Sequence, residues 1–443
     1  MKRQVVIIGG GASGMMAAIQ AARAGAEVTV LEHMDRVGKK ILSTGNGRCN
    51  LTNRYQTPEC YRCSQKEFPQ QALARFSLDD TLDFFQNLGI LLKDRNGYLY
   101  PNSDQASTVL DMLRMELEHL GVHVWVNCQV KSVKKQGRQF VIETDQEKGR
   151  LQADAVIVAA GSKAAPVTGS DGSGYELAKS LGHRIVTPLP ALVQLRCKEK
   201  HYKQLAGIRT DVEIRLMVKR PENGEKAVDV RKQMQADRGY KGKIEAGKNR
   251  GEIWEAAASE KGELQLTDYG ISGIPTFQIS RFASIALNKG YQVKAVIDFL
   301  PQMELWETDK MMKQRCQQMS YKTAEDWMVG LLNKKLSLVL LKLAGIGPQQ
   351  KVAEVPRAKW KELLKWMKSY ETMIVSVNPY ENAQVCCGGV DTREVAAETM
   401  ESRKVPGLYF AGEILDVDGI CGGYNLQWAW SSGAVAGRCA AGI

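Results

Sequence analysis

A glycine-rich turn near the start of the chain constrains the fold more than any other feature. The segment carries, in order, a short apolar strand, three spaced glycines, a helical stretch, a second strand and an acid: Val5–Ile8, then Gly9, Gly11 and Gly14, then Met15–Ala24, Glu27–Leu31 and Glu32. A GxGxxG sequence alone is weak, but strand, glycines, helix, strand and acid in register are typical of the βαβ unit that binds an adenine dinucleotide.

The glycines of this turn and the acid that follows each have a physical role in binding a dinucleotide. Gly9 permits the tight strand-to-helix turn, Gly11 lets the backbone approach a pyrophosphate, and Gly14 allows close packing of helix on strand. The helix N-terminus offers free N–H groups and the positive end of its dipole to phosphates. Glu32 lies near the expected spacing of about 20 residues for the carboxylate that binds the adenosine ribose, where it would repel a 2′-phosphate.

Length and composition indicate a multidomain globular protein. At about 150 residues per domain, a chain of 443 residues is expected to have two to four domains. The most apolar late stretch, Leu331–Leu343, is interrupted by Lys334, Lys335 and Lys342, so no membrane span is expected. The apolar run after Met1 is too short for a signal peptide. We therefore expect a cytoplasmic protein without membrane association.

The cysteines suggest a metal site and the positive charge suggests a nucleic-acid partner, but the sequence favours neither. Cys60 and Cys63 form a CxxC pair, but no second pair follows at zinc-site spacing, so no metal site is predicted. The net charge is +11, and basic residues concentrate in Lys198–Lys261. Because no stripe on a single element is visible, the pattern favours solvated loops over a nucleic-acid partner.

Further segments contribute candidate cofactor contacts. The glycine-rich, cationic run Gly38–Asn53 follows the second strand directly, and its backbone amides and lysines are suited to continue the dinucleotide cradle. From this run we take Lys40, Gly45 and Arg48 as candidates. A second buried parallel strand, Ala155–Val158, leads through small residues to Gly161, which repeats the pattern of the opening segment.

The end of the chain returns to the same pattern and adds a second helix N-terminus. Val405–Phe410 contains a turn and an apolar strand, followed shortly by Gly412 and Glu413. Gly423 and Asn425 then open a helix, whose N–H groups suit the pyrimidine edge of a flavin. This late element predicts FAD rather than a nicotinamide dinucleotide.

Three long segments resemble the BaiN/YhiN-like family of bacterial FAD-dependent oxidoreductases, which also includes aminoacetone-oxidase-like members: Gly38–Asn53, Asp268–Gly273 and Gly407–Ala429. The resemblance covers the whole chain. It implies an α/β fold with a split Rossmann-like, glutathione-reductase-like FAD domain (1–190 and 371–443), interrupted by an antiparallel β-barrel (191–302) and a helical subdomain (303–370). The FAD contacts that it implies are Ser13, Glu32, Val130, Gly412, Glu413, Asn425 and Leu426.

The resemblance also implies an activity. It favours an enzyme acting on CH–CH groups that reduces C=C bonds of a 3-oxo bile acid or a similar lipophilic enone, a small-molecule substrate, with NAD(P)H as candidate co-substrate. The alternatives are an aminoacetone-type amine oxidase using O2 and a flavin-bearing RNA-binding or RNA-modifying factor.

The sequence leaves the chemistry of the substrate site open. It departs from the family pattern at Asp268 and Ile274, and the charged stretch Lys219–Arg250 is longer than usual. We assign no catalytic residue. Tyr424 is a candidate proton donor because it flanks the predicted flavin helix, and a structural role is its alternative.

Overall fold

The computed structural model describes residues 2–147, 149–219 and 254–443. Apart from Lys219, the charged stretch Lys219–Arg250 lies outside these residues. The chain divides into two compact units. The first unit comprises Met1–Pro190 and Tyr380–Ile443, and the inserted unit comprises Ala191–Pro379.

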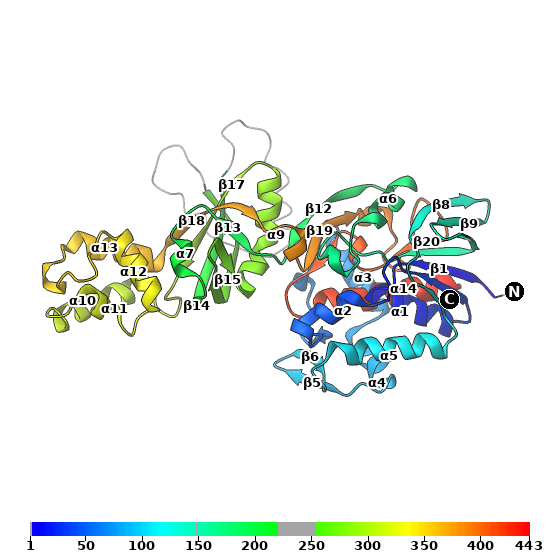
Figure 1. The fold of residues 1–443 in the computed structure, drawn as a ribbon, viewed down its shortest axis with the longest axis horizontal. Coiled ribbons are helices and arrows are strands. Elements are labelled where there is room, and N and C mark those ends of the chain that lie inside the picture. Colours follow the sequence, from blue (N-terminus) through cyan, green and yellow to red (C-terminus); the bar gives the residue numbers. More distant parts are fainter. Residues whose placement is uncertain (1, 148, 220–253) are drawn as a thin grey trace. The chain divides into compact units, whose positions relative to one another are not determined.

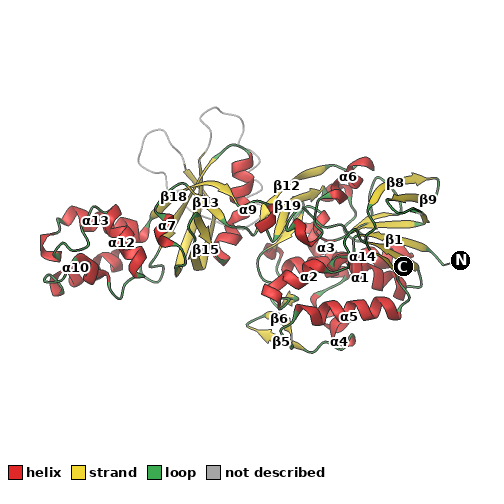
Figure 2. Cartoon of the chain, viewed as in Figure 1, coloured by secondary structure: helices red, strands yellow, loops and turns green. Residues whose placement is uncertain are grey.

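The first unit is an α/β structure (Figures 1 and 2). Its strands are β1 (Gln4–Ile8), β2 (Glu27–Leu31), β3 (Thr52–Asn53), β4 (Tyr61–Cys63), β5 (Leu92–Arg95), β6 (Tyr98–Pro101), β7 (His123–Trp125), β8 (Val130–Gln136), β9 (Gln139–Thr144), β10 (Arg150–Ala153), β11 (Ala155–Val158), β12 (Ile185–Ala191), β19 (Val385–Val390), β20 (Leu408–Phe410) and β21 (Val417–Gly419). Its α-helices are α1 (Ala12–Arg23), α2 (Lys39–Ser43), α3 (Glu67–Arg75), α4 (Leu78–Asn87), α5 (Ala106–His119), α6 (Ser173–Ser180) and α14 (Tyr424–Ala441).

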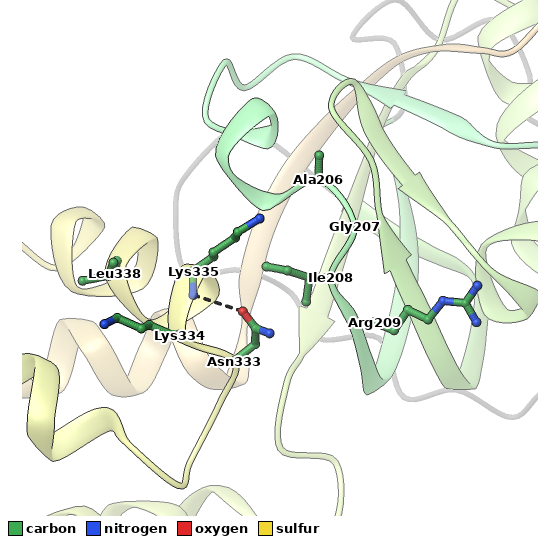
Figure 3. A pocket seen from close by; sticks show the side chains of 8 residues that line it. All are labelled: Ala206, Gly207, Ile208, Arg209, Asn333, Lys334, Lys335 and Leu338. Atoms are coloured by element: carbon green, nitrogen blue, oxygen red, sulfur yellow. Dashed lines mark hydrogen bonds between the residues drawn. The ribbon is translucent and has the colours of Figure 1, made fainter.

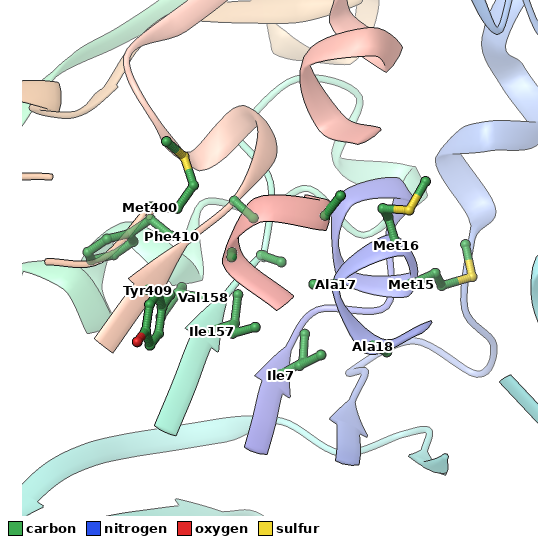
Figure 4. Packing of buried hydrophobic residues seen from close by; sticks show 14 of the residues in the cluster. Ile7, Met15, Met16, Ala17, Ala18, Ile157, Val158, Met400, Tyr409 and Phe410 are labelled. Atoms are coloured by element: carbon green, nitrogen blue, oxygen red, sulfur yellow. The ribbon is translucent and has the colours of Figure 1, made fainter. Parts of the chain in front are cut away.

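A five-stranded parallel sheet forms the centre of the first unit, in the order β20-β11-β1-β2-β7. Ile7 pairs with Ile157 on β11 and with Val30 on β2, and all three side chains are fully buried. Figure 4 shows Ile7, Ile157 and the α1 residues Met16 and Ala17 within one apolar cluster. The apolar runs of the sequence form strands here because both faces of a parallel sheet are covered.

The last helix, α14, packs directly on the first helix, α1. Gly433 and Gly437 make this close approach feasible, since a Cβ at either position would come within 2.4 Å of Ser13 O or 2.3 Å of Ala17 O. The N-terminal and C-terminal parts of the split domain therefore share one core. This arrangement agrees with a Rossmann-type α/β fold assembled from the two ends of the chain.

The inserted unit combines antiparallel strands with helices. Its strands are β13 (Leu195–Cys197), β14 (Arg209–Lys219), β15 (Trp254–Leu266), β16 (Gly270–Ser272), β17 (Gln292–Asp298) and β18 (Tyr370–Val377). Its α-helices are α7 (Tyr202–Leu205), α9 (Ile274–Asn288), α10 (Leu305–Gln318), α11 (Ala324–Met328), α12 (Lys334–Leu343) and α13 (Arg357–Lys368).

The six strands of the inserted unit pair in the order β13-β16-β15-β14-β17-β18, and β18 pairs back with β13. Along β14 the side chains of Val212, Ile214, Leu216 and Val218 are buried, and those between them are more exposed. This alternation is expected of an antiparallel strand with one face toward a core.

The return of the chain to the first unit differs from the sequence expectation. We expected the second FAD segment to start at residue 371, but the structure places the boundary at Tyr380. The reason is β18, which follows the helical stretch and pairs with both β13 and β17 of the inserted unit.

None of the helices in the described part of the chain combines the length and the apolar composition of a membrane span.

Candidate functional site

Four of the predicted cofactor segments lie at one edge of the parallel sheet. The GxGxxG turn follows β1, Glu32 follows β2, Gly161 follows β11, and Gly412 follows β20. These four strands are parallel neighbours, so their carboxyl ends meet at the same edge. Ligands of open α/β sheets bind at this edge.

The three glycines of the turn differ in what surrounds them. A Cβ at Gly9 would lie 2.5 Å from Ala159 O, and a Cβ at Gly14 would lie 1.9 Å from Gly9 O. In contrast, a Cβ at Gly11 would meet no described atom within 4 Å. Gly9 and Gly14 therefore serve packing, whereas Gly11 borders open space at the N-terminus of α1. A phosphate group could therefore approach the backbone N–H groups at this helix end.

Glu32 is buried and held in place by backbone amides. Its Oε2 accepts a hydrogen bond from Gly10 N at 2.8 Å, and its Oε1 accepts one from Met34 N at 2.9 Å. Each carboxylate oxygen can accept a second hydrogen bond. The carboxylate is thus fixed beside the glycine turn and keeps acceptor capacity for ribose hydroxyls.

Glu413 forms a polar cluster with Lys40 and Ser162. Lys40 Nζ donates to Glu413 Oε2 at 2.6 Å and to Ala164 O at 3.2 Å, and Ser162 Oγ donates to the same carboxylate oxygen at 3.4 Å. The other oxygen, Oε1, is buried and has no hydrogen-bond partner among the described residues. Sequence reasoning did not find Ser162, because a serine after a strand carries no distinctive signal.

These features fit FAD. The open space at Gly11 suits its pyrophosphate, the Glu32 carboxylate suits its adenosine ribose, and the unsatisfied Glu413 oxygen is an acceptor for a hydroxyl group. A buried carboxylate oxygen without a donor is costly in a protein interior, so a hydroxylated ligand at this point would lower the free energy of the site.

The N-terminus of α14 is built around two backbone contacts. Gly423, at its N-cap, has a φ of +94°, and a Cβ there would lie 2.8 Å from the Thr52 backbone. Asn425 Oδ1 accepts from Gly419 N at 2.8 Å, and Asn425 Nδ2 donates to Gly419 O at 3.0 Å. The Asn425 side chain therefore holds the preceding loop. Leu426 is half-buried next to it.

Two further residues of α14 fix the Gly412 turn, and sequence reasoning missed both. Ser432 Oγ accepts from Gly412 N at 2.9 Å, and Trp428 Nε1 donates to Gly412 O at 3.1 Å. Gly412 itself has a φ of +78° and lies against Ser13, where a Cβ would be 2.4 Å from Ser13 Oγ. A helical Trp or Ser is ordinarily a core or surface residue, so nothing in the sequence singles out these two.

The remaining candidates occupy different surroundings. Val130 is buried at the start of β8, in the separate β8-β9-β10 sheet, and the segment before it contacts the end of β2 through Cys128 N, which donates to Glu32 O at 2.9 Å. Gly45 lies in the turn Thr44–Gly47 with a φ of +56° and, like Arg48, is exposed. For Gly45 and Arg48, contact with the cofactor therefore stays a prediction.

Tyr424 is packed rather than open. Its ring lies edge-on to Tyr61 at 5.9 Å between centroids, and burial raises the pKa of its phenol.

Of the CxxC pair nearby, Cys63 Sγ lies 3.4 Å from Thr392 Oγ1 and Cys60 Sγ lies 3.6 Å from Thr57 Oγ1, so the two thiols have different partners. In the described ranges, no group of His, Cys, Asp and Glu could hold a metal ion.

A separate pocket of about 530 Å³ lies within the inserted unit, between the start of β14 and the start of α12 (Figure 3). It is lined by Ala206, Gly207, Ile208, Arg209, Asn333, Lys334, Lys335 and Leu338. Two of its three cations already have acidic partners: Arg209 lies 3.2 Å from Glu263, and Lys334 lies 3.0 Å from Glu325. None of the predicted cofactor residues lines this pocket.

Two known proteins resemble the chain over nearly its whole length. It is 42% identical over 99% of both chains to a 3-dehydro-bile acid delta(4,6)-reductase of Clostridium scindens. It is 31% identical over 96% of both chains to a ribosomal RNA dihydrouridine synthase of Haemophilus influenzae. Among solved structures, the open conformation of a flavocytochrome c3 fumarate reductase matches with a TM-score of 0.47 and 15% identity, covering 99% of this chain and 78% of that chain.

The family comparison covers nearly the same span. Residues 3–439 match the HI0933-like protein Rossmann domain family. The match includes both segments of the first unit and the whole inserted unit. The chain therefore belongs to the HI0933-like family of Rossmann-domain proteins.

Proposed function

We propose that the chain is an FAD-dependent oxidoreductase acting on CH–CH groups, which reduces the conjugated C=C bonds of a 3-oxo bile acid or a similar lipophilic enone with electrons from NAD(P)H. The observation that carries this proposal is the 42% identity, over 99% of both chains, to the reductase of Clostridium scindens. The geometry at the sheet edge supports the FAD part, because its acceptors and open space fit that cofactor.

Different residues of the first unit would bind different parts of FAD. When bound, FAD supplies the hydride that the β-carbon of an enone accepts. The α1 N-terminus and Gly11 would hold the pyrophosphate, Glu32 would hold the adenosine ribose, and Glu413 with Lys40 would hold the ribityl chain. The α14 N-terminus at Gly423 would offer N–H donors to the flavin.

Substrate specificity is expected to come from a different part of the chain. We assign this role to the inserted unit, with the predicted barrel at 191–302 and the helical subdomain at 303–370, because it carries the sequence departures Asp268 and Ile274. Reduction of an enone also needs a donor for its carbonyl oxygen. Tyr424 keeps its proton at neutral pH, since burial raises its pKa, and it stays a candidate for this donor. The reaction would take place in the cytoplasm on a small molecule.

A second candidate function is the reduction of uridine in ribosomal RNA. It is favoured by the 31% identity over 96% of both chains to the dihydrouridine synthase of Haemophilus influenzae and by the net charge of +11. The chemistry is closely related, because the C5=C6 bond of uracil is also conjugated to a carbonyl group. The two candidates therefore differ in the substrate site and share the need for reduced flavin.

One anaerobic experiment separates these functions. The bound flavin is reduced with one equivalent of dithionite, and a steroid 4-en-3-one acid or an unmodified ribosomal RNA fragment is added while the flavin absorbance is followed. Rapid flavin reoxidation by the steroid alone supports the proposal, and reoxidation by the RNA alone supports the second candidate. Aminoacetone is added to the oxidised enzyme in a parallel sample, and rapid flavin bleaching there would indicate an amine oxidase.

A further inference from the structure

The buried polar atoms of the first unit that have no hydrogen-bond partner among the described residues include the hydroxyl of Tyr175 and Oε1 of Glu413. Tyr175 lies on α6 and is 2% exposed. Glu413 follows β20, and its other carboxylate oxygen is already engaged by Lys40 at 2.6 Å. Buried groups are nearly always paired, so two unsatisfied atoms in one region call for an explanation.

The two groups belong to one polar cluster. Burial, together with the nearby Cys386, Glu413 and Asp416, raises the pKa of the Tyr175 phenol. Burial, with Glu413 next in effect, raises the pKa of the Cys386 thiol to about 11. The backbone geometry brings the two segments together: a Cβ at Gly174, next to Tyr175 in the chain, would lie 2.7 Å from Cδ1 of Ile414, next to Glu413. Tyr175 and Glu413 are therefore neighbours, although no direct hydrogen bond is found between them.

The chemistry of the two atoms complements a single type of ligand group. The Tyr175 phenol keeps its proton and can donate a hydrogen bond, whereas a carboxylate oxygen can only accept one. A hydroxyl group both accepts and donates, so it can satisfy the two atoms at once. A carbonyl or a phosphate oxygen could satisfy only the tyrosine.

We propose that Tyr175 and Glu413 together form a hydroxyl subsite, in which one ribityl hydroxyl of FAD accepts a hydrogen bond from Tyr175 Oη and donates one to Glu413 Oε1. This inference rests on the FAD binding of the proposed function. Tyr175 is a positioning residue for the cofactor, a role that neither its sequence context nor the predicted contacts assigned to it. The neighbouring oxygen of Asp416, Oδ1, accepts from Gly388 N at 3.1 Å.

The test combines the variant Tyr175→Phe with FAD analogues that lack one ribityl hydroxyl each, at the 2′, 3′ or 4′ position. Dissociation constants are measured by titrating apoprotein and following the quenching of flavin fluorescence. Wild-type protein should lose about tenfold in affinity for one of the three analogues, as expected for one hydrogen bond to a charged group. Y175F should bind FAD about tenfold more weakly and lose little further affinity for that same analogue.

Tyr202→Phe is the matched control, because Tyr202 is also a fully buried tyrosine but lies on α7 of the inserted unit. Y202F should leave the affinity for FAD and for every analogue unchanged. Two results would overturn the inference: unchanged FAD affinity in Y175F, or losses for Y175F and for every analogue that simply add. Either result would mean that Tyr175 does not contact the ribityl chain.

A second measurement applies if Y175F fails to take up FAD after refolding. A high-resolution structure of the wild-type holoenzyme should place one ribityl oxygen within about 3 Å of both Tyr175 Oη and Glu413 Oε1. A water molecule alone between these two atoms would refute the subsite. These readouts concern cofactor affinity only. If the enzyme does not reduce enones but the affinity losses of Y175F and one analogue do not add, the proposed function is rejected and the subsite is kept. If the enzyme reduces enones but these losses simply add, the subsite is rejected and the proposed function is kept.

Discussion

The substitution Gly11→Ala separates cofactor binding from folding. A Cβ at Gly11 would meet no described atom within 4 Å, and the residue has a φ of −77°, which alanine adopts without strain. We therefore expect the free energy of unfolding of the apoprotein to rise by no more than about 1 kcal/mol, because alanine restricts the unfolded chain.

The same methyl group would occupy the space that we assign to the pyrophosphate. If it displaces two hydrogen bonds between phosphate and backbone N–H groups, each worth about 1.5–3 kcal/mol, the loss is roughly 3–6 kcal/mol. This corresponds to an increase of about 10²- to 10⁴-fold in the dissociation constant of FAD. Urea unfolding of the apoprotein and fluorescence titration with FAD measure the two effects separately.

Gly14→Ala is the matched comparison, because a Cβ there would lie 1.9 Å from Gly9 O. This substitution should destabilise the apoprotein itself by roughly 3 kcal/mol through overpacking between α1 and the turn. The reasoning would be refuted if G11A bound FAD as tightly as the wild type, or if G11A destabilised the apoprotein as much as G14A does.

Three other predictions concern the same unit. Burial lowers the pKa of His183 from its ordinary value of 6.5, so the folded protein resists protonation of this side chain. The free energy of unfolding should therefore fall as the pH drops below about 6.5. In urea unfolding measured at a series of pH values, His183→Gln should make this fall smaller. Lys40→Met leaves the Glu413 carboxylate without its cation and should cost about 2 kcal/mol of stability in urea unfolding. Lys39→Met removes a more exposed pair with Asp35 and should leave the stability nearly unchanged, so equal effects of the two substitutions would contradict the role of Lys40. Gln427→Leu removes the amide that bonds Thr52, Thr81 and Ser431 at 2.6, 2.8 and 2.9 Å and should lower stability by about 3 kcal/mol, and a thermal midpoint equal to that of the wild type would contradict it.

The opening turn could be predicted from the sequence because its requirements are local. The tight turn at Gly9, the close packing at Gly14 and the acid at Glu32 follow from residue types at fixed spacing, and the structure has β1, α1 and β2 at the expected places. Long apolar runs such as Val5–Ile8 and Ala155–Val158 likewise predict buried parallel strands, because few other structures bury every side chain of such a run.

Contacts between distant parts of the chain could not be predicted in this way. The hydrogen bonds of Trp428 and Ser432 to Gly412 depend on how α14 packs under the end of β20. Asn425 illustrates the same limit, because the two hydrogen bonds of its side chain to the Gly419 backbone could not be read from the sequence, and its contact with FAD stays a prediction. The position of β18 was also missed, because an eight-residue strand after a long helical stretch has no local marker of the sheet that it joins.

We propose that this chain transfers a hydride from FAD to a conjugated C=C bond, and a single-turnover experiment measures this transfer. Enzyme with fully reduced flavin is mixed anaerobically with one equivalent of a steroid 4-en-3-one acid, and the flavin spectrum and the mass of the steroid are recorded together. We predict one molecule of steroid that is heavier by two hydrogens for each flavin oxidised. A flavin that stays reduced while the steroid is recovered unchanged would contradict the account.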